Sequence, residues 1–247
     1  MRDRKWLKDK NNNAASLYLG PFITAKSRAP VCNTLIMKCA ACLCAKAHIR
    51  SPENLNPRCS NVCMSLKRGH VHPGDCISAD HYISLVPGCL PHTFGQEKHG
   101  YTCGSLFVDH ASGKFFNFCQ YSTNANETIK SAQRLESMAR QENFKVKKYH
   151  SDNGIFATTA FKTHCESQQQ EFSFSGVGAH HQNGVAKRNI KTVAQWARAN
   201  MLHLALHWPA QANISFWPQA IKYSVWVFNR MPNAETGISP NKIWSSV

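Results

Sequence analysis

The chain has 247 residues, 43% of them hydrophobic, which is enough for one good core with a small appendage. Its 29 lysines and arginines outnumber its 14 acids, giving a formal net charge of +15. That excess favours a polyanionic partner, most often nucleic acid, although a soluble basic protein with no specific partner has the same balance. No apolar run reaches the roughly 18 residues of a membrane helix, so no membrane partner is expected.

The cysteines and the N-terminal segment bear on the compartment. The 11 cysteines are odd in number, and Met1–Lys10 is charged, without the apolar stretch of a signal peptide. Free thiols in a reducing compartment are therefore expected. The sequence predicts an intracellular protein, in the nucleus or cytoplasm, that is not secreted.

The first 70 residues differ in composition from the rest. Residues 1–30 are polar and rich in Asn and Lys, which is typical of a disordered leader. Residues 31–70 hold six cysteines among basic and Pro/Asn-containing stretches. Regular patterns begin near Asp75.

Three strands are predicted first. Asp75–Leu85 alternates so that Ile77 and Ala79 share one face and Asp80 projects from the other. Segments 104–109 and 114–121 are rich in Phe and Val and flank His-Ala-Ser-Gly at 110–113, which predicts a hairpin.

Helices and strands then alternate. Asn124 with Glu127 resembles a capping box ahead of a helix whose apolar positions recur at helical spacing. Residues 145–151 predict a strand that ends at Asp152, residues 158–170 a helix, and residues 171–175 a strand.

Two long helices complete the pattern. The first spans about 182–206 and carries Lys187, Lys191 and Arg198 on one face, beside Arg188. This face suits phosphates, although an ordinary solvated helix face has the same look. The second spans 216–229 and is entered through Trp217-Pro218, where Pro suits the first turn of a helix. The order predicts a mixed α/β sheet with helices on both faces.

Two acids and one base stand where chemistry is expected. Asp80 and Asp152 have the carboxylates of a two-metal phosphoryl-transfer site, and Lys187 stands where a third acid would complete it. Two aspartates and a glutamate can hold two Mg²⁺ ions. An ammonium has no lone pair for a cation at neutral pH.

Seven motifs carry a family resemblance over about 75–247. They are Ser78–Asp80, Phe107–Ser112, Ser151–Gly154, Gln182–Arg188, Phe216–Ala220, Asn229–Pro232 and Gly237–Trp244. In order and spacing they resemble the integrase catalytic core of copia-type (Pseudoviridae-like) LTR retrotransposon polyproteins, within the retroviral integrase superfamily. The resemblance implies a ribonuclease-H-like mixed five-stranded sheet at 75–230, with 231–247 as a C-terminal extension of this core.

The resemblance also implies roles for individual residues. Asp80 and Asp152 would be catalytic metal ligands for Mg²⁺ or Mn²⁺, and Lys187 replaces the catalytic Glu. Lys191 lies where related integrases present a basic residue to DNA, with Arg188 and Arg198 nearby. Glu166 and Glu171 are not placed by spacing to stand in for the missing acid, and Asp109 is expected to serve its turn. His180 and His181 are expected to be structural or to face solvent.

The cysteine-rich segment resembles part of another module. Cys39 and Cys42 match the Cys-x-x-Cys end of the zinc module that precedes copia-type cores, where two upstream histidines complete the site. The first histidine here is His48, so zinc is not expected and the segment is interpreted as a remnant. Recruitment of Cys32, His48, Cys59 or Cys63 by a zinc ion is the alternative.

The functional interpretation has two branches. The first is an integrase core, a fragment of a transposable-element polyprotein for DNA integration by 3′-processing and strand transfer, inactivated at Lys187. The second is a non-catalytic basic nucleic-acid-binding remnant or domesticated module. DNA is the expected partner in both, and the resemblance allows a homodimer or higher oligomer. A third reading is a pseudogene product that never accumulates as folded protein.

Overall fold

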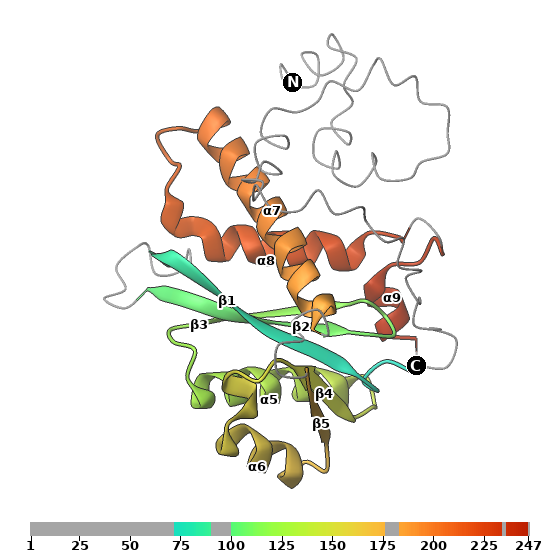
Figure 1. Cartoon of the computed structure of the whole chain (residues 1–247). Helices are drawn as coiled ribbons and strands as arrows, with labels where there is room; N and C mark the ends of the chain where they lie inside the picture. Colours follow the sequence, from blue (N-terminus) through green and yellow to red (C-terminus); the bar gives the residue numbers. More distant parts are fainter. Residues whose placement is uncertain (1–71, 90–99, 176–182, 234–235, 247) are drawn as a thin grey trace, which may run out of the picture.

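The computed structural model describes residues 72–89, 100–175, 183–233 and 236–246 (Figure 1). The predicted leader, the cysteine-rich segment with Cys39 and Cys42, and the pair His180 and His181 lie outside the described residues, so the predictions for them stay predictions. Among the described helices, none combines the length and the apolar character needed to cross a membrane.

A five-stranded mixed sheet forms the centre of the fold. Its strands are β1 (Ile77–Gly88), β2 (Tyr101–Asp109), β3 (Phe115–Gln120), β4 (Lys148–Ser151) and β5 (Glu171–Phe174). They lie in the order β3-β2-β1-β4-β5. The first three pair antiparallel, and β1, β4 and β5 pair in parallel. The predicted mixed α/β sheet is confirmed.

The β2–β3 hairpin is closed by a buried carboxylate. Asp109 Oδ2 accepts hydrogen bonds from the backbone N–H and the hydroxyl of Ser112, both at 2.7 Å. Its Oδ1 accepts the backbone N–H of Gly74 at 2.9 Å, which ties the start of the domain to this turn. Gly113 follows with φ +69°, a conformation that favours glycine. The expected turn role of Asp109 is confirmed.

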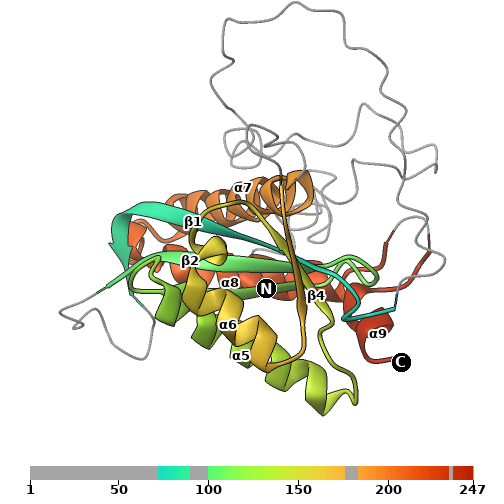
Figure 2. The ribbon, with the colours of Figure 1, turned by 60° about the horizontal axis from the view of Figure 1, so that its bottom comes forward.

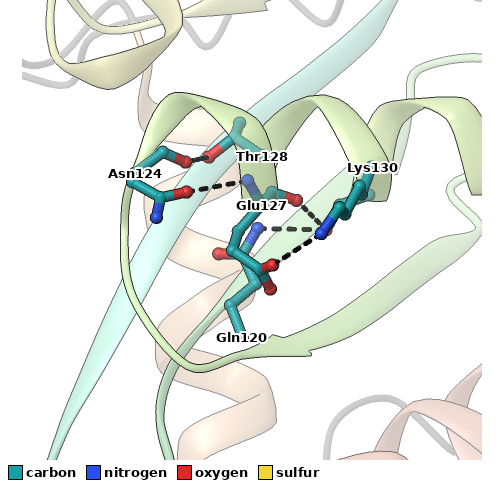
Figure 3. A network of polar contacts seen from close by, with 6 residues as sticks. Gln120, Asn124, Glu127, Thr128 and Lys130 are labelled. Carbon is teal, nitrogen blue, oxygen red and sulfur yellow. Dashed lines mark hydrogen bonds and ion pairs between the residues drawn. The ribbon is translucent and has the colours of Figure 1, made fainter.

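Helix α5 (Ala125–Gln141) begins as the sequence predicts. Asn124 caps it by accepting the Glu127 backbone N–H at 2.8 Å, and Glu127 pairs with Lys130 at 3.2 Å (Figure 3). Below this first turn, the Gln120 amide donates to the Ser131 hydroxyl at 3.0 Å, which joins the end of β3 to the helix.

Helix α6 (Thr159–Ser167) is shorter than the predicted 158–170. The chain turns left-handed at Gln169, whose φ is +57°, and the Gln170 N–H returns to the Cys165 carbonyl at 2.9 Å. This closes the helix three residues early. The β4 strand is also shorter than predicted and begins at Lys148.

The helices lie in two layers, one on each face of the sheet (Figure 2). On one face, α5, α6 and the 3₁₀ turn Ile155–Ala157 cover a core that includes Ala79, Phe107 and Leu135. On the other, α7 (Gly184–His207) and α8 (Trp217–Arg230) cover Leu106, Val108 and Phe115. A second 3₁₀ turn, Ile214–Phe216, leads into α8.

The C-terminal motifs are fastened to the sheet. The Asn229 side chain accepts the Phe115 N–H at 2.8 Å and donates to the Phe115 carbonyl at 2.7 Å, which satisfies both backbone groups at the free edge of β3. Trp244, in α9 (Pro240–Trp244), is fully buried, with its ring 4.8 Å from Phe116 and 4.5 Å from Phe144. Residues beyond Arg230 therefore contribute to the main core.

Candidate active site

Asp80 is the fourth residue of β1 and faces the α7 side of the sheet. Its partner on β2 is Leu106, which belongs to the core under α7 and α8, and directly paired residues share a face. Ala79, one residue earlier, is buried in the opposite core. The predicted alternation is thus confirmed. Asp80 itself is 9% exposed.

Asp152 comes level with Asp80 because β4 runs parallel to β1. Ser78 pairs with His150, so two residues further along both strands the chain reaches Asp80 and Asp152. Asp152 Oδ1 accepts the Gly154 N–H at 3.3 Å, and a Cβ at position 154 would come within 3.1 Å of that oxygen. Asn153 donates to the Ser175 carbonyl at 3.1 Å. The Ser-Asp-Asn-Gly motif therefore forms a fixed turn that presents one carboxylate.

Lys187 enters this site from the first turn of α7. Its Nζ lies 3.9 Å from Asp152 Oδ2, with 38% of the lysine and 33% of the aspartate side chain exposed. A pair this open is worth little in stability because water and salt screen it. Its position matters more, since it puts a positive charge beside the two carboxylates.

The electrostatics of Asp80 report on this arrangement. Burial, and then the negative charge of Asp152, raise the pKa of the Asp80 carboxyl to about 6. The backbone N–H of His81, 2.8 Å from Asp80 Oδ1, and the charge of Lys187 act in the opposite direction. Lys187 therefore acts as a partial counter-ion to Asp80 in this site.

Asn183 is a structural member of the site that the sequence reasoning did not identify. It is fully buried at the start of α7, and its amide donates to the Ala79 carbonyl at 3.3 Å, next to Asp80. An Asn before a helix is the usual signal of an N-cap, but this side chain makes no capping bond and reaches the sheet instead. This bond fixes the start of α7 against the sheet, and with it the position of Lys187.

His81 supports the site from the other face of the sheet. Its ring stacks on Phe156 with centroids 4.6 Å apart, and its Nε2 lies 3.0 Å from the Thr128 hydroxyl. Burial lowers the pKa of His81 to about 4, so the ring is neutral at physiological pH. It packs as a core side chain.

These residues do not fit a two-metal centre. Within the described ranges, no group of three His, Cys, Asp or Glu side chains could hold a metal ion. Two carboxylates and an ammonium supply too few anionic oxygens for Mg²⁺ or Mn²⁺, and the ammonium repels a cation. Glu171 pairs with Lys148 at 3.7 Å, and Glu166 is exposed on α6, on the opposite face of the sheet.

The predicted cationic face lies along the solvent side of α7. Arg188, Lys191 and Arg198 are all exposed. Lys191 follows Lys187 by about one helical turn and Arg198 by about three, so they share one stripe of the helix. The stripe begins at the carboxylates and runs away from them.

Comparisons with known proteins point to one group. No family model matches the chain. Over 143 residues, 57% of the chain, it is 25% identical to a "Retrovirus-related Pol polyprotein from transposon TNT 1-94" of Nicotiana tabacum, of which it spans 10%.

Solved structures show the same fold. The HTLV-2 integrase catalytic core domain in complex with magnesium matches with a TM-score of 0.51 and 19% identity, covering 70% of this chain and 97% of that one. A simian T-cell lymphotropic virus intasome in complex with PP2A regulatory subunit B56 gamma matches with a TM-score of 0.54 and 14% identity, covering 71% of this chain and 56% of that one. The described part of this chain therefore has the mixed five-stranded, ribonuclease-H-like fold of integrase catalytic cores, and its sequence is similar to part of the Pol polyprotein of a tobacco transposon.

Proposed function

We propose that this copia-type core has lost 3′-processing and strand transfer and retains DNA binding. One observation carries the proposal: Lys187 Nζ lies 3.9 Å from Asp152 Oδ2, and the family resemblance expects the third acid at position 187. The substitution exchanges a ligand of charge −1 for a group of charge +1 beside two carboxylates.

The loss follows from the chemistry of the reaction. Phosphoryl transfer by this superfamily relies on divalent ions to activate the attacking oxygen and to stabilise the leaving oxygen. A carboxylate at position 187 would complete the ligand set, whereas an ammonium pairs with Asp152. Asp80 and Asp152 are thus metal ligands by descent whose affinity for Mg²⁺ or Mn²⁺ is weak.

DNA binding rests on different residues. The exposed side chains of Arg188, Lys191 and Arg198 extend from the site along α7, and a formal net charge of +15 attracts a polyanion. None of these three basic side chains is needed to hold a metal. DNA binding therefore survives the loss of catalysis, whether in a decayed element or in a domesticated, non-catalytic module.

We also propose that the chain forms a homodimer or higher oligomer, which sedimentation velocity tests.

A strand-transfer assay with Mn²⁺ on a preprocessed DNA end tests the proposal. The native chain should give no product, and Lys187→Glu should give product because it restores the third ligand. Lys187→Gln, which removes the charge but adds no carboxylate, should stay silent, as should Lys187→Glu combined with Asp152→Asn.

Calorimetry with Mn²⁺ gives a second readout that does not depend on DNA. The Lys187→Glu chain should bind the ion measurably more tightly than the native chain, and the Asp152→Asn combination should lose that gain. Strand transfer by the native chain, or native Mn²⁺ affinity equal to that of Lys187→Glu, would refute the loss of function.

A further inference from the structure

The solvent face of α8 carries two aromatic rings that contribute little to the core. Tyr223 is 50% exposed and Trp226 is 52% exposed. Their ring centroids lie 6.2 Å apart, and the ring planes are 11° from parallel. The opposite face of the helix, which includes Ile221 and Val225, packs against the sheet. The helix therefore does not need the two rings for its packing, and adjacent exposed rings are typical of a binding surface.

Arg230 extends this aromatic surface toward the end of α8. Its guanidinium lies 4.2 Å from the centroid of the Trp226 ring, and it donates a hydrogen bond to the Trp226 carbonyl at 3.4 Å. A planar guanidinium stacks well on an aromatic face, so the contact holds both groups in place while Arg230 stays exposed. Tyr223, Trp226 and Arg230 thus present three planar groups along one stripe of the helix, at positions i, i+3 and i+7.

The charge of this part of the chain bears on the partner. From Phe172 to Val247 the sequence has seven lysines and arginines and one acid, Glu235. No Asp or Glu lies on α7, α8 or α9, and the exposed Lys222 adjoins Tyr223 on the solvent face of α8. A twofold dimer through this face would bring two copies of the same basic stripe together without an acid to pair them. A polyanion has the complementary charge.

A polyanion with accessible base faces matches both the rings and the charge. Duplex DNA keeps its bases stacked on one another, whereas a single strand can place unpaired bases on aromatic rings while basic side chains contact its phosphates. We infer that Tyr223, Trp226 and Arg230 form a stacking surface for the bases of single-stranded nucleic acid, with Lys222 beside its phosphates. These residues are not those of the α7 stripe, so the inference goes beyond the proposed binding of duplex DNA.

The test compares the native full chain with Trp226→Leu by fluorescence anisotropy, using a labelled oligothymidine strand and a labelled DNA duplex. Leucine keeps an apolar side chain at this exposed position but has no ring face. Affinity for the single strand should fall about tenfold, and affinity for the duplex should be almost unchanged. Arg230→Lys keeps the charge but loses the planar guanidinium, so it should also weaken single-strand binding selectively.

The matched control is Trp208→Leu. Trp208 is 55% exposed but follows the end of α7, outside this surface. Its replacement should leave both affinities unchanged, and circular dichroism should show that every variant keeps the helix content of the native chain. Equal losses from Trp226→Leu and Trp208→Leu, or a native chain that does not bind the single strand, would overturn the inference.

Sedimentation velocity decides whether a second copy of the chain covers this face instead. The inference requires that Trp226→Leu lower the affinity for the single strand without changing the sedimentation coefficient. A variant that dissociates a native dimer but binds the single strand as tightly as the native chain would show that the face serves self-association. The duplex measurements report separately on the proposed role of α7.

Discussion

Lys187 and Asp80 make the electrostatic part of the site testable at single residues. Lys187 lowers the pKa of Asp80 while burial and Asp152 raise it, with a result of about 6. Lys187→Gln should therefore raise the pKa of Asp80 further, and Asp152→Asn should lower it. Carboxyl ¹³C chemical shifts followed against pH measure both changes.

Lys191→Gln is the matched control, since it removes the same charge one turn further along α7. It should leave the Asp80 titration almost unchanged. If Lys187→Gln and Lys191→Gln have equal effects, the Lys187 charge does not act locally and the counter-ion role is wrong.

The same residues show what sequence could reach. Asp80, Asp152 and Lys187 were predicted to meet, because motif order places them on β1, after β4 and on α7, and the structure brings Asp152 and Lys187 to 3.9 Å. The contact of Asn183 with the Ala79 carbonyl was not predictable. Local patterns describe Asn183 relative to its own helix, whereas its bond crosses 104 residues of chain.

At the scale of elements, one buried carboxylate joins α5, β4, α6 and the connection from α6 to β5. Glu136 Oε1 on α5 accepts the Tyr149 hydroxyl of β4 at 3.1 Å and the Gln170 amide before β5 at 3.0 Å, and it lies 3.1 Å from His164 Nε2 on α6. Burial raises the pKa of Glu136, but the hydrogen bonds from His164 and Gln170 outweigh it and hold that pKa below its usual value.

Glu136→Gln should therefore cost about 2 kcal/mol of unfolding free energy at neutral pH, since hydrogen bonds to a charged group are exchanged for neutral ones. A lowered pKa means that this stability is present above the unfolded pKa and is lost as pH falls through the folded one. The difference between native and variant should shrink in acid. Urea unfolding across pH measures it.

Glu166→Gln, an exposed acid on α6, is the control and should change stability little at any pH. A Glu136→Gln penalty that stays constant down to acid pH would show that shape, rather than charge, makes the position important.

Element ends show where sequence reasoning stops. The start of α5 was predicted because Asn124 and Glu127 form a local signal, and the structure has the bond. The predicted end of α6 is three residues too late, because Gln169 adopts a left-handed conformation that is rare for glutamine and cannot be recognised from the sequence. Just beyond this turn, the Gln170 side chain donates to Glu136 on α5 and the Glu171 N–H donates to the Lys147 carbonyl, and no local pattern predicts these distant partners.

For the whole molecule, charge should govern affinity for DNA. A formal net charge of +15 and an exposed stripe on α7 predict binding to duplex DNA of any sequence, with affinity that falls steeply with salt. Each phosphate contact contributes about 0.9 to the slope of log affinity against log salt. Lys191→Gln and Arg198→Gln should each reduce that slope by about one. Fluorescence anisotropy from low to moderate salt measures it.

Lys130→Gln is the matched control, because Lys130 is equally basic and exposed but lies on α5, on the opposite face of the sheet, paired with Glu127. It should lower affinity only slightly and leave the slope nearly unchanged. Equal losses from Lys130→Gln and Lys191→Gln would mean that DNA responds to overall charge alone. A slope near zero in the native chain would remove the phosphate-binding role of α7 altogether. The stripe begins at Lys187. If the chain lacks the third acid but still binds DNA, its affinity should depend steeply on salt while the strand-transfer assay gives no product.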